Sequence, residues 1–258
     1  MSAVPTAALV AAPVCGLVCG LAGLGVPTLI RRLPAPSSGA APDPPGPPPD
    51  AEPGPPPAPT PAFSAVAARA GLRWRTAGLS AAAAVVVVAS VGWSWPLLFL
   101  LPTVPVAVLL GYVDLRTRLL PKVVVLPMTW LAIALVGACA AVTGDGHALV
   151  RALVGMVAAR SVFWVLWWVD SAGLGFGDVR LAALLGLELA WFGWAELAVG
   201  TYAAFLVFGV PGLLVALWRR DRRLLRTALP FGPAMLLGAL VGLAAGAGLW
   251  SHLAGGAA

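Results

Sequence analysis

Long apolar stretches separated by short polar segments form the main pattern of this sequence. Many of them run for about 20 residues, the length that an α-helix needs to cross the hydrocarbon core of a bilayer. The pattern predicts about eight transmembrane helices, with the N-terminus outside, over residues 7–30, 77–92, 95–113, 123–142, 148–169, 178–193, 196–218 and 233–252. The expected fold class is therefore all-α: a polytopic membrane helix bundle.

The composition supports this interpretation. Apolar residues make up 60% of the chain, charged residues only 10%, and the mean hydropathy is +0.94. A soluble domain carries about 25% charged residues, so this chain has too little polar surface to cover itself in water. These values exclude an ordinary soluble globular protein.

The basic residues are distributed unevenly between the two ends of the predicted helices. With eight helices and an external N-terminus, 14 of the 16 Lys and Arg residues fall on one side. Lys and Arg near membrane helices stay in the cytoplasm, so that side is predicted to be cytoplasmic. The net charge of +6 follows from this topology and requires no nucleic-acid partner. Arg151 and Arg160 are the two exceptions.

A proline-rich segment divides the chain. Residues 34–61 contain 14 of the 25 prolines, together with Gly, Ser, Asp and Glu. Such a composition cannot bury a core. We therefore expect three parts: a first transmembrane helix in residues 1–32, a disordered cytoplasmic linker in 33–72, and a membrane-embedded bundle in 73–258.

Two aspartates are predicted to lie at the same membrane surface. Asp114 lies where the third predicted helix reaches the cytoplasm, and Asp178, 64 residues later, lies where the sixth helix leaves it. Each has a simpler explanation. Asp178 could cap the start of a helix, and Asp114 could pair with Arg116 or Arg118. Ionisable residues near the membrane are nevertheless functional candidates.

The side chains available for chemistry on that surface are carboxylates. Neither the two His nor the three Cys residues are predicted to lie there, which leaves no His base for a serine nucleophile and no His or Cys ligand for a metal. Two carboxylates held close together do not both ionise easily, so one keeps its proton while the other acts as a base. Such a pair could activate water and polarise a peptide carbonyl, as in aspartic proteases. It needs neither a cofactor nor a metal.

The segment GLGFGDVRL around the second aspartate is a recognisable motif. It resembles the GxGD signature of intramembrane-type aspartic proteases, with Gly175, Gly177 and Asp178 as its fixed points. A GxGD run alone is weak evidence for that class, so the assignment depends on further motifs.

Two further motifs resemble markers of the bacterial type IV prepilin peptidases. DLRTRLLP, from Asp114 to Pro121, is similar to the first-aspartate motif of that family. LPFGPAMLLGA, from Leu229 to Ala239, is similar to the PFGP run that opens the last helix of that family. The three motifs occur in the order of the family and extend over most of the predicted bundle.

The resemblance implies an aspartic endopeptidase of the inner (plasma) membrane. Such an enzyme removes the short basic leader of type IV prepilin-like precursors at the cytoplasmic face, so the expected partners are those precursors and the lipid bilayer. The resemblance implies that Asp114 and Asp178 form the catalytic pair. The residues expected to contact the substrate are Gly175, Gly177, Arg180 and Pro121.

The same resemblance argues against a second activity. Members of the family with two functions carry a cysteine-bearing cytoplasmic domain, which is associated with N-methylation of the mature pilin. Residues 33–72 contain no Cys and no apolar core. We therefore expect cleavage without N-methyltransferase activity.

Two other functions stay open. An ion or proton-coupled transporter could use acids at the membrane edge to bind a cation or relay protons. Its acids would be expected along a path at mid-membrane, whereas the principal pair here is predicted at one surface. A catalytically inactive relative could instead serve as an assembly scaffold.

Arg160 and Glu188 are expected to form an ion pair inside the bundle. Arg160 precedes Asp170 by ten residues, and Glu188 follows Asp178 by ten. Both therefore lie about 15 Å from the cytoplasmic ends of their helices. The loop between these helices is short, so antiparallel contact is expected. The competing explanation is an Arg that reaches outward alone.

Overall fold

The computed structural model describes residues 6–34, 63–169, 174–219 and 230–255. Within these ranges the chain is helical and contains no strand, so the expected all-α class is confirmed. The helices are α1 (Thr6–Leu24), α2 (Val26–Arg31), α3 (Phe63–Ala67), α4 (Leu72–Val91), α5 (Leu97–Thr117), α6 (Lys122–Thr143), α7 (Gly146–Val169), α8 (Phe176–Phe192), α9 (Trp194–Arg219) and α10 (Gly232–Gly255).

The eight predicted transmembrane segments all fall on helices. Within the described residues, six segments are long and apolar enough to cross a membrane on their own: Ala11–Arg31, Leu72–Val91, Leu97–Thr117, Lys122–Thr143, Gly146–Val169 and Gly232–His252. The other two predicted segments correspond to α8, which has 17 residues, and to α9, whose apolar part is Trp194–Val210. The chain is thus a multi-pass membrane helix bundle, as predicted.

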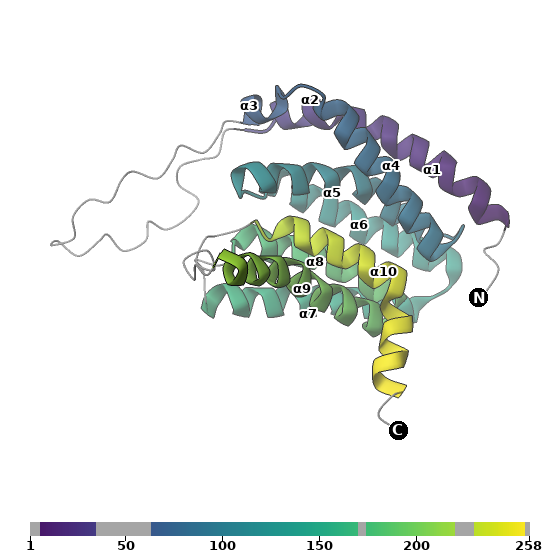
Figure 1. Ribbon diagram of the computed structural model, residues 1–258. Helices are drawn as coiled ribbons and strands as arrows, with labels where there is room; N and C mark the ends of the chain where they lie inside the picture. The colour runs from purple at the N-terminus through teal and green to yellow at the C-terminus, as the bar shows by residue number, and fades with distance from the viewer. Residues whose placement is uncertain (1–5, 35–62, 170–173, 220–229, 256–258) are drawn as a thin grey trace.

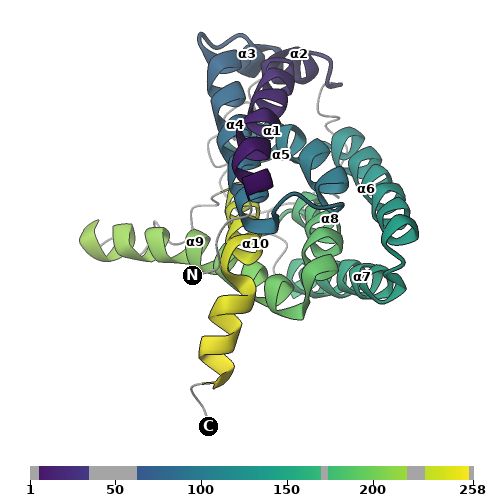
Figure 2. The same cartoon turned by 90° about the vertical axis from the view of Figure 1, so that its right-hand side faces the viewer.

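Helix α8 lies in the interior of this bundle. Figures 1 and 2 show α7 beside α8 and α1 along α4, while α9 packs against α10. Because α6, α7, α9 and α10 all pack on α8, its side chains are buried along nearly its whole length. Both of its acidic residues, Asp178 and Glu188, are therefore withdrawn from the surface.

One end of the bundle brings together helix ends that are far apart in sequence. The end of α5 and the beginnings of α6, α8 and α10 lie there, on the left in Figure 1. These helix ends carry the DLRTRLLP, GLGFGDVRL and PFGP segments. The arrangement follows from the alternating direction of successive membrane helices.

Residues 63–67 form α3, although the sequence placed them in the proline-rich linker. The linker interpretation does not extend to them because they are apolar: Phe63, Val66 and Ala67 are buried. Helix α3 packs on α2 and α5. The rest of the predicted linker, residues 35–62, lies outside the described residues.

The predicted ion pair between Arg160 and Glu188 is wrong. Helix α7 turns Ala159 towards α8, so closely that a Cβ atom added at Gly186 would lie 2.6 Å from the Ala159 Cβ. Arg160, the next residue along α7, consequently points away and is exposed. Glu188 is buried and accepts a hydrogen bond from the Thr103 hydroxyl at 2.6 Å instead.

Arg151, the other exceptional cation, binds the end of α8. Its guanidinium donates hydrogen bonds to the carbonyl oxygens of Ala190 (2.7 Å), Trp191 and Phe192 (3.4 Å). The last carbonyl groups of a helix have no partner within the helix and form the negative end of its dipole. This contact explains a cation at a membrane side where the topology predicts none.

Candidate active site

Asp114, the first predicted catalytic residue, is buried in the last turn of α5, with 4% of its surface exposed. After this turn Arg118 adopts a left-handed conformation (φ 55°) and donates its backbone N–H to the Asp114 carbonyl at 2.8 Å. The Asp114 carboxyl oxygen Oδ2 accepts the backbone N–H of Gly232 at 2.9 Å. Asp114 is thereby fixed against the start of α10.

Gly232 belongs to the PFGP segment, and its small size is required at this position. A Cβ atom there would lie 2.7 Å from Asp114 Oδ2, too close for an ordinary contact. Gly232 is the first residue of α10, and the first N–H groups of a helix have no carbonyl partner within it. The free N–H of Gly232 is therefore available to the carboxylate.

Phe231 anchors the start of α10 beside Asp114. Its buried ring lies among aromatic rings of α7 and α9, with centroid distances of 6.0 Å to Phe163, 5.2 Å to Phe205 and 5.0 Å to Phe208. Aromatic pairs of this kind contribute about 0.5–1.5 kcal/mol each beyond the burial of their surface. They hold the neighbouring Gly232 in place.

Asp178, the second predicted catalytic residue, is the third residue of α8 and is 6% exposed. Its oxygen Oδ2 accepts the N–H of Gly175, the residue just before the helix, at 3.0 Å. Such a contact stabilises a helix start, where negative charge is favourable. The other oxygen, Oδ1, is buried and has no hydrogen-bond partner among the described residues. Helix capping therefore accounts for only one of the two oxygens.

The two carboxyl groups lie at the same end of the bundle, on segments that touch where Gly177 approaches Leu120. One comes from the end of α5 and the other from the start of α8, and the start of α10 is hydrogen-bonded to the first. The three motifs identified in the sequence thus meet at one end of the bundle. Two buried carboxyl groups that share a site disfavour simultaneous ionisation, which is the condition for acid–base chemistry by such a pair.

Gly177 lies against the end of the first-aspartate motif, DLRTRLLP. A Cβ atom at Gly177 would lie 2.7 Å from the Cβ of Leu120. The close approach that this glycine permits is therefore to a residue of the same chain. Leu120 was not singled out in the sequence; the signal was its place directly before Pro121, the half-buried residue that precedes α6.

Arg180 and Gly175 lie on either side of the second aspartate. The Arg180 guanidinium stacks over the Phe176 ring at 4.7 Å, and that ring packs edge-on against Trp167 at 5.0 Å. Gly175 is exposed. These residues surround the start of α8, and their contact with a substrate stays a prediction, as it does for Gly177 and Pro121.

Fold and site together define a class of protein: a multi-pass membrane protein that buries two neighbouring aspartates at one end of its helix bundle. Within the part of the chain that the structure describes, no group of three or more His, Cys, Asp or Glu side chains is placed to hold a metal ion. The carboxyl pair is therefore the arrangement from which a function is inferred.

Comparison with known proteins narrows this class to a family. Residues 101–217, which include both aspartates, match the type IV leader peptidase family. Similar proteins are the prepilin leader peptidase/N-methyltransferases of Dickeya chrysanthemi, Escherichia coli (strain K12) and Burkholderia pseudomallei (strain 1026b), which are 35%, 33% and 33% identical over 153, 139 and 131 residues. Residues 101–217 thus resemble the type IV leader peptidase family, and the predicted resemblance to bacterial type IV prepilin peptidases is confirmed.

The similarity covers part of each protein. The three alignments include 56%, 52% and 49% of this chain, and 50%, 57% and 39% of the respective relatives. The chain therefore spans about half the length of the curated relatives it matches. No solved structure matches the chain.

Proposed function

We propose that this protein is a membrane aspartic endopeptidase that cleaves the leader from type IV prepilin-like precursors. The observation that carries the proposal is that Asp114 and Asp178 are both buried at the same end of the bundle, on segments that are far apart in sequence but touch where Gly177 approaches Leu120. The match of residues 101–217 to the type IV leader peptidase family supports the substrate class.

The pair would act by shared acid–base chemistry. The ionised carboxylate takes a proton from a water molecule, whose oxygen attacks the carbonyl carbon of the scissile peptide bond. The protonated carboxyl group gives its proton to the carbonyl oxygen. Collapse of the tetrahedral intermediate then breaks the C–N bond, and a proton passes to the leaving nitrogen.

Backbone contacts orient the pair for this reaction. The N–H of Gly232 holds Asp114 Oδ2, and the N–H of Gly175 holds Asp178 Oδ2. Hydrogen bonds from N–H groups to a carboxylate are shorter and stronger than those between neutral groups. The oxygen Oδ1 of Asp178 has no such partner among the described residues and is free to accept a hydrogen bond from water.

The inner (plasma) membrane is the proposed location, with the site at the cytoplasmic face. This orientation is supported by the cations that flank the site, Arg116, Arg118 and Lys122, since basic residues near membrane helices stay in the cytoplasm. Precursor proteins and the bilayer are the proposed partners.

Cleavage is proposed without N-methyltransferase activity. The matched relatives carry both activities in their names. The chain between α2 and α4, however, contains no cysteine. In the family that this chain resembles, methylation is associated with a cysteine-bearing domain at that place. The proposal concerns this chain, which spans about half of each relative.

Ion or proton transport is the second candidate function. Its support is Glu188, a buried acid that lies ten residues beyond Asp178 along α8. We rank it second because the cavity beside Glu188 is lined almost entirely by apolar side chains. A path for ions requires polar groups or water along its length.

The decisive experiment is a cleavage assay in membranes. The chain is co-expressed with a prepilin-like precursor, and the mature product is measured for the wild type, Asp114→Asn and Asp178→Asn. Both variants are expected to abolish cleavage, because each removes a member of the proton-sharing pair. Asp145→Asn is the matched control: Asp145 Oδ1 accepts the N–H of Ala148 at the start of α7, a contact that asparagine can also make.

Two results would contradict the proposal. Cleavage by either variant at more than a small fraction of the wild-type rate would remove that aspartate from the catalytic role. A wild-type chain that is correctly inserted but leaves every tested precursor intact would favour the inactive scaffold. Mass spectrometry of the mature N-terminus, with S-adenosylmethionine present, tests for methylation in the same samples.

A further inference from the structure

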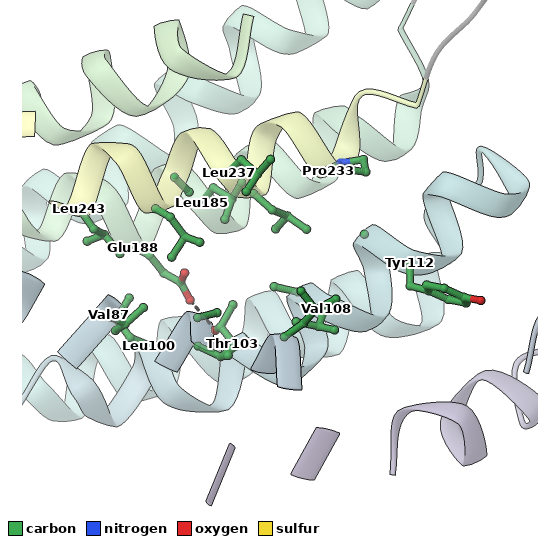
Figure 3. A pocket seen from close by; sticks show the side chains of 18 of the residues that line it. Val87, Leu100, Thr103, Val108, Tyr112, Leu185, Glu188, Pro233, Leu237 and Leu243 are labelled. Atoms are coloured by element: carbon green, nitrogen blue, oxygen red, sulfur yellow. Dashed lines mark hydrogen bonds between the residues drawn. The ribbon is translucent and has the colours of Figure 1, made fainter. Parts of the chain in front are cut away.

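A buried hydrogen bond joins the two helices that carry the aspartates. The Thr103 hydroxyl of α5 donates to the Glu188 carboxyl oxygen Oε1 of α8 at 2.6 Å, and each residue is only 5% exposed. Figure 3 shows this contact beside an apolar cavity that is lined mainly by α4, α5 and α10. A carboxyl group in such surroundings is unfavourable unless it is hydrogen-bonded, so its presence requires an explanation.

The bond lies at the same depth on both helices. Thr103 precedes Asp114 by 11 residues and Glu188 follows Asp178 by ten. At 1.5 Å per residue, the contact is about 16 Å from the first aspartate and about 15 Å from the second. Because α5 and α8 run in opposite directions, each pair has one member on α5 and one on α8 at matching depths. The aspartate pair lies near the end of the bundle, and the Thr103–Glu188 pair lies deeper.

Direct contact between α5 and α8 is concentrated near the Thr103–Glu188 level, where the Phe99 ring also lies 5.7 Å from Trp191 and 6.5 Å from Phe192 between centroids. Both helices also pack on α6 and α10. A cavity of about 290 Å³ lies beside them, and Val104, Val108 and Leu185 are among the side chains that line it. With this cavity beside them, the separation of the two helices depends on the few contacts that join them, the Thr103–Glu188 hydrogen bond among them.

We propose that Thr103 and Glu188 are positioning residues, which set the separation of α5 and α8 and thereby the approach of Asp114 to Asp178. The proposal rests on the proposed function, because the effect is exerted on the acid pair of that reaction. Neither residue touches the reacting atoms. A shift of about 1 Å in a reacting group costs up to about a hundredfold in rate, so a small change in helix separation is enough.

Kinetics of four variants in nanodiscs test the proposal. Thr103→Val and Glu188→Leu remove the hydrogen bond, whereas Thr103→Ser and Glu188→Gln keep a hydroxyl or an amide able to form it. We expect the first two to lower kcat about tenfold to a hundredfold with little change in KM. The two conservative variants are expected to stay within about threefold of the wild type, which corresponds to less than the free energy of one hydrogen bond.

Thr129→Val is the matched control for loss of a hydroxyl. The Thr129 hydroxyl of α6 donates to the Val125 carbonyl of its own helix at 2.8 Å and joins no other helix. Its kcat is expected to equal that of the wild type. A loss as large as that of Thr103→Val would show that any such truncation in the bundle disturbs catalysis, and would overturn the proposal.

The double variant Thr103→Val/Glu188→Leu separates positioning from stability. Thr103→Val leaves the Glu188 carboxyl without its hydrogen-bond partner, whereas the double variant removes both groups, so its thermal midpoint is expected to recover relative to Thr103→Val. Its kcat is expected to remain low because the link between the helices is absent. Recovery of kcat together with stability would show that the pair only stabilises the fold.

A distance measurement keeps the test independent of cleavage. Spin labels at Leu115→Cys and Val169→Cys, both exposed positions, report the separation between α5 and the α7–α8 unit when the native cysteines are replaced by alanine. The distribution is expected to shift or broaden in the variants without the hydrogen bond only. If it does so while no form cleaves a precursor, the proposed function fails and the positioning role stands. Unchanged distances in an active protein would overturn the positioning role alone.

Discussion

Replacing Gly232 by alanine is expected to impair catalysis while leaving both aspartates in place. The added Cβ atom would lie 2.7 Å from Asp114 Oδ2, whereas favourable contacts between heavy atoms begin near about 3.5 Å. The carboxyl group or the start of α10 must therefore move by roughly 0.8 Å. Phe231 resists movement of the helix start, because its ring is held by the aromatic residues of α7 and α9.

The displacement falls on Asp114, so kcat is expected to drop about tenfold to a hundredfold, since a 1 Å displacement can cost about a hundredfold. The strain is also expected to lower the free energy of unfolding by about 1–3 kcal/mol, as for other overpacked sites. The assay is cleavage of a prepilin-like precursor by purified protein in nanodiscs, with thermal unfolding measured on the same preparation.

Gly248→Ala provides the matched control on the same helix. No atom lies within 4 Å of a Cβ atom built at Gly248, and alanine favours a helix by about 0.8–1.0 kcal/mol over glycine. Its kcat is expected to be unchanged and its stability equal or higher. A Gly232→Ala protein with wild-type kcat would refute the reasoning, because the hydrogen bond to Asp114 would then be irrelevant to the reaction.

Two further predictions concern helix α8. Gly177→Ala is expected to reduce kcat because the new Cβ meets the Leu120 Cβ at 2.7 Å. Leu120→Gly in the same chain removes that atom and is expected to restore part of the rate; an equal loss in the double variant would contradict this steric cause. Arg151→Leu is expected to lower the free energy of unfolding by about 1.5–3 kcal/mol, because the carbonyl groups at the end of α8 lose a charged donor. Arg151→Lys is its control, and thermal unfolding that is unchanged in Arg151→Leu would contradict the capping role.

The positions of the helices could be predicted from the sequence because the length of an apolar stretch can be counted along the chain and compared with the thickness of a bilayer. Each predicted segment falls on a helix, and Asp114 and Asp178 were placed at one membrane surface by counting along the chain. The same counting failed for Arg160 and Glu188. Equal depth says nothing about which face of a helix is turned inwards, and α7 turns Ala159 towards α8.

Contacts between helices that are far apart in sequence could likewise not be predicted from the sequence pattern. The PFGP segment was recognised, but the donation of the Gly232 N–H to Asp114 spans 118 residues and depends on how three helices pack. The Thr103–Glu188 contact across the cavity has the same origin. Short motifs identify residues with unusual roles, and the partners of those residues follow only from the packing of the helices.

The unequal surroundings of the two Asp178 oxygens have a consequence for inhibitors. Oδ2 is occupied by the Gly175 N–H, while Oδ1 has no partner among the described residues. A compound that directs a hydroxyl or N–H group at Oδ1 would form a hydrogen bond to a charged acceptor, worth about 1.5–3 kcal/mol. The mirror-image compound would present its donor on the side that is already occupied. Inhibitors of this site are therefore expected to show a marked preference for one enantiomer.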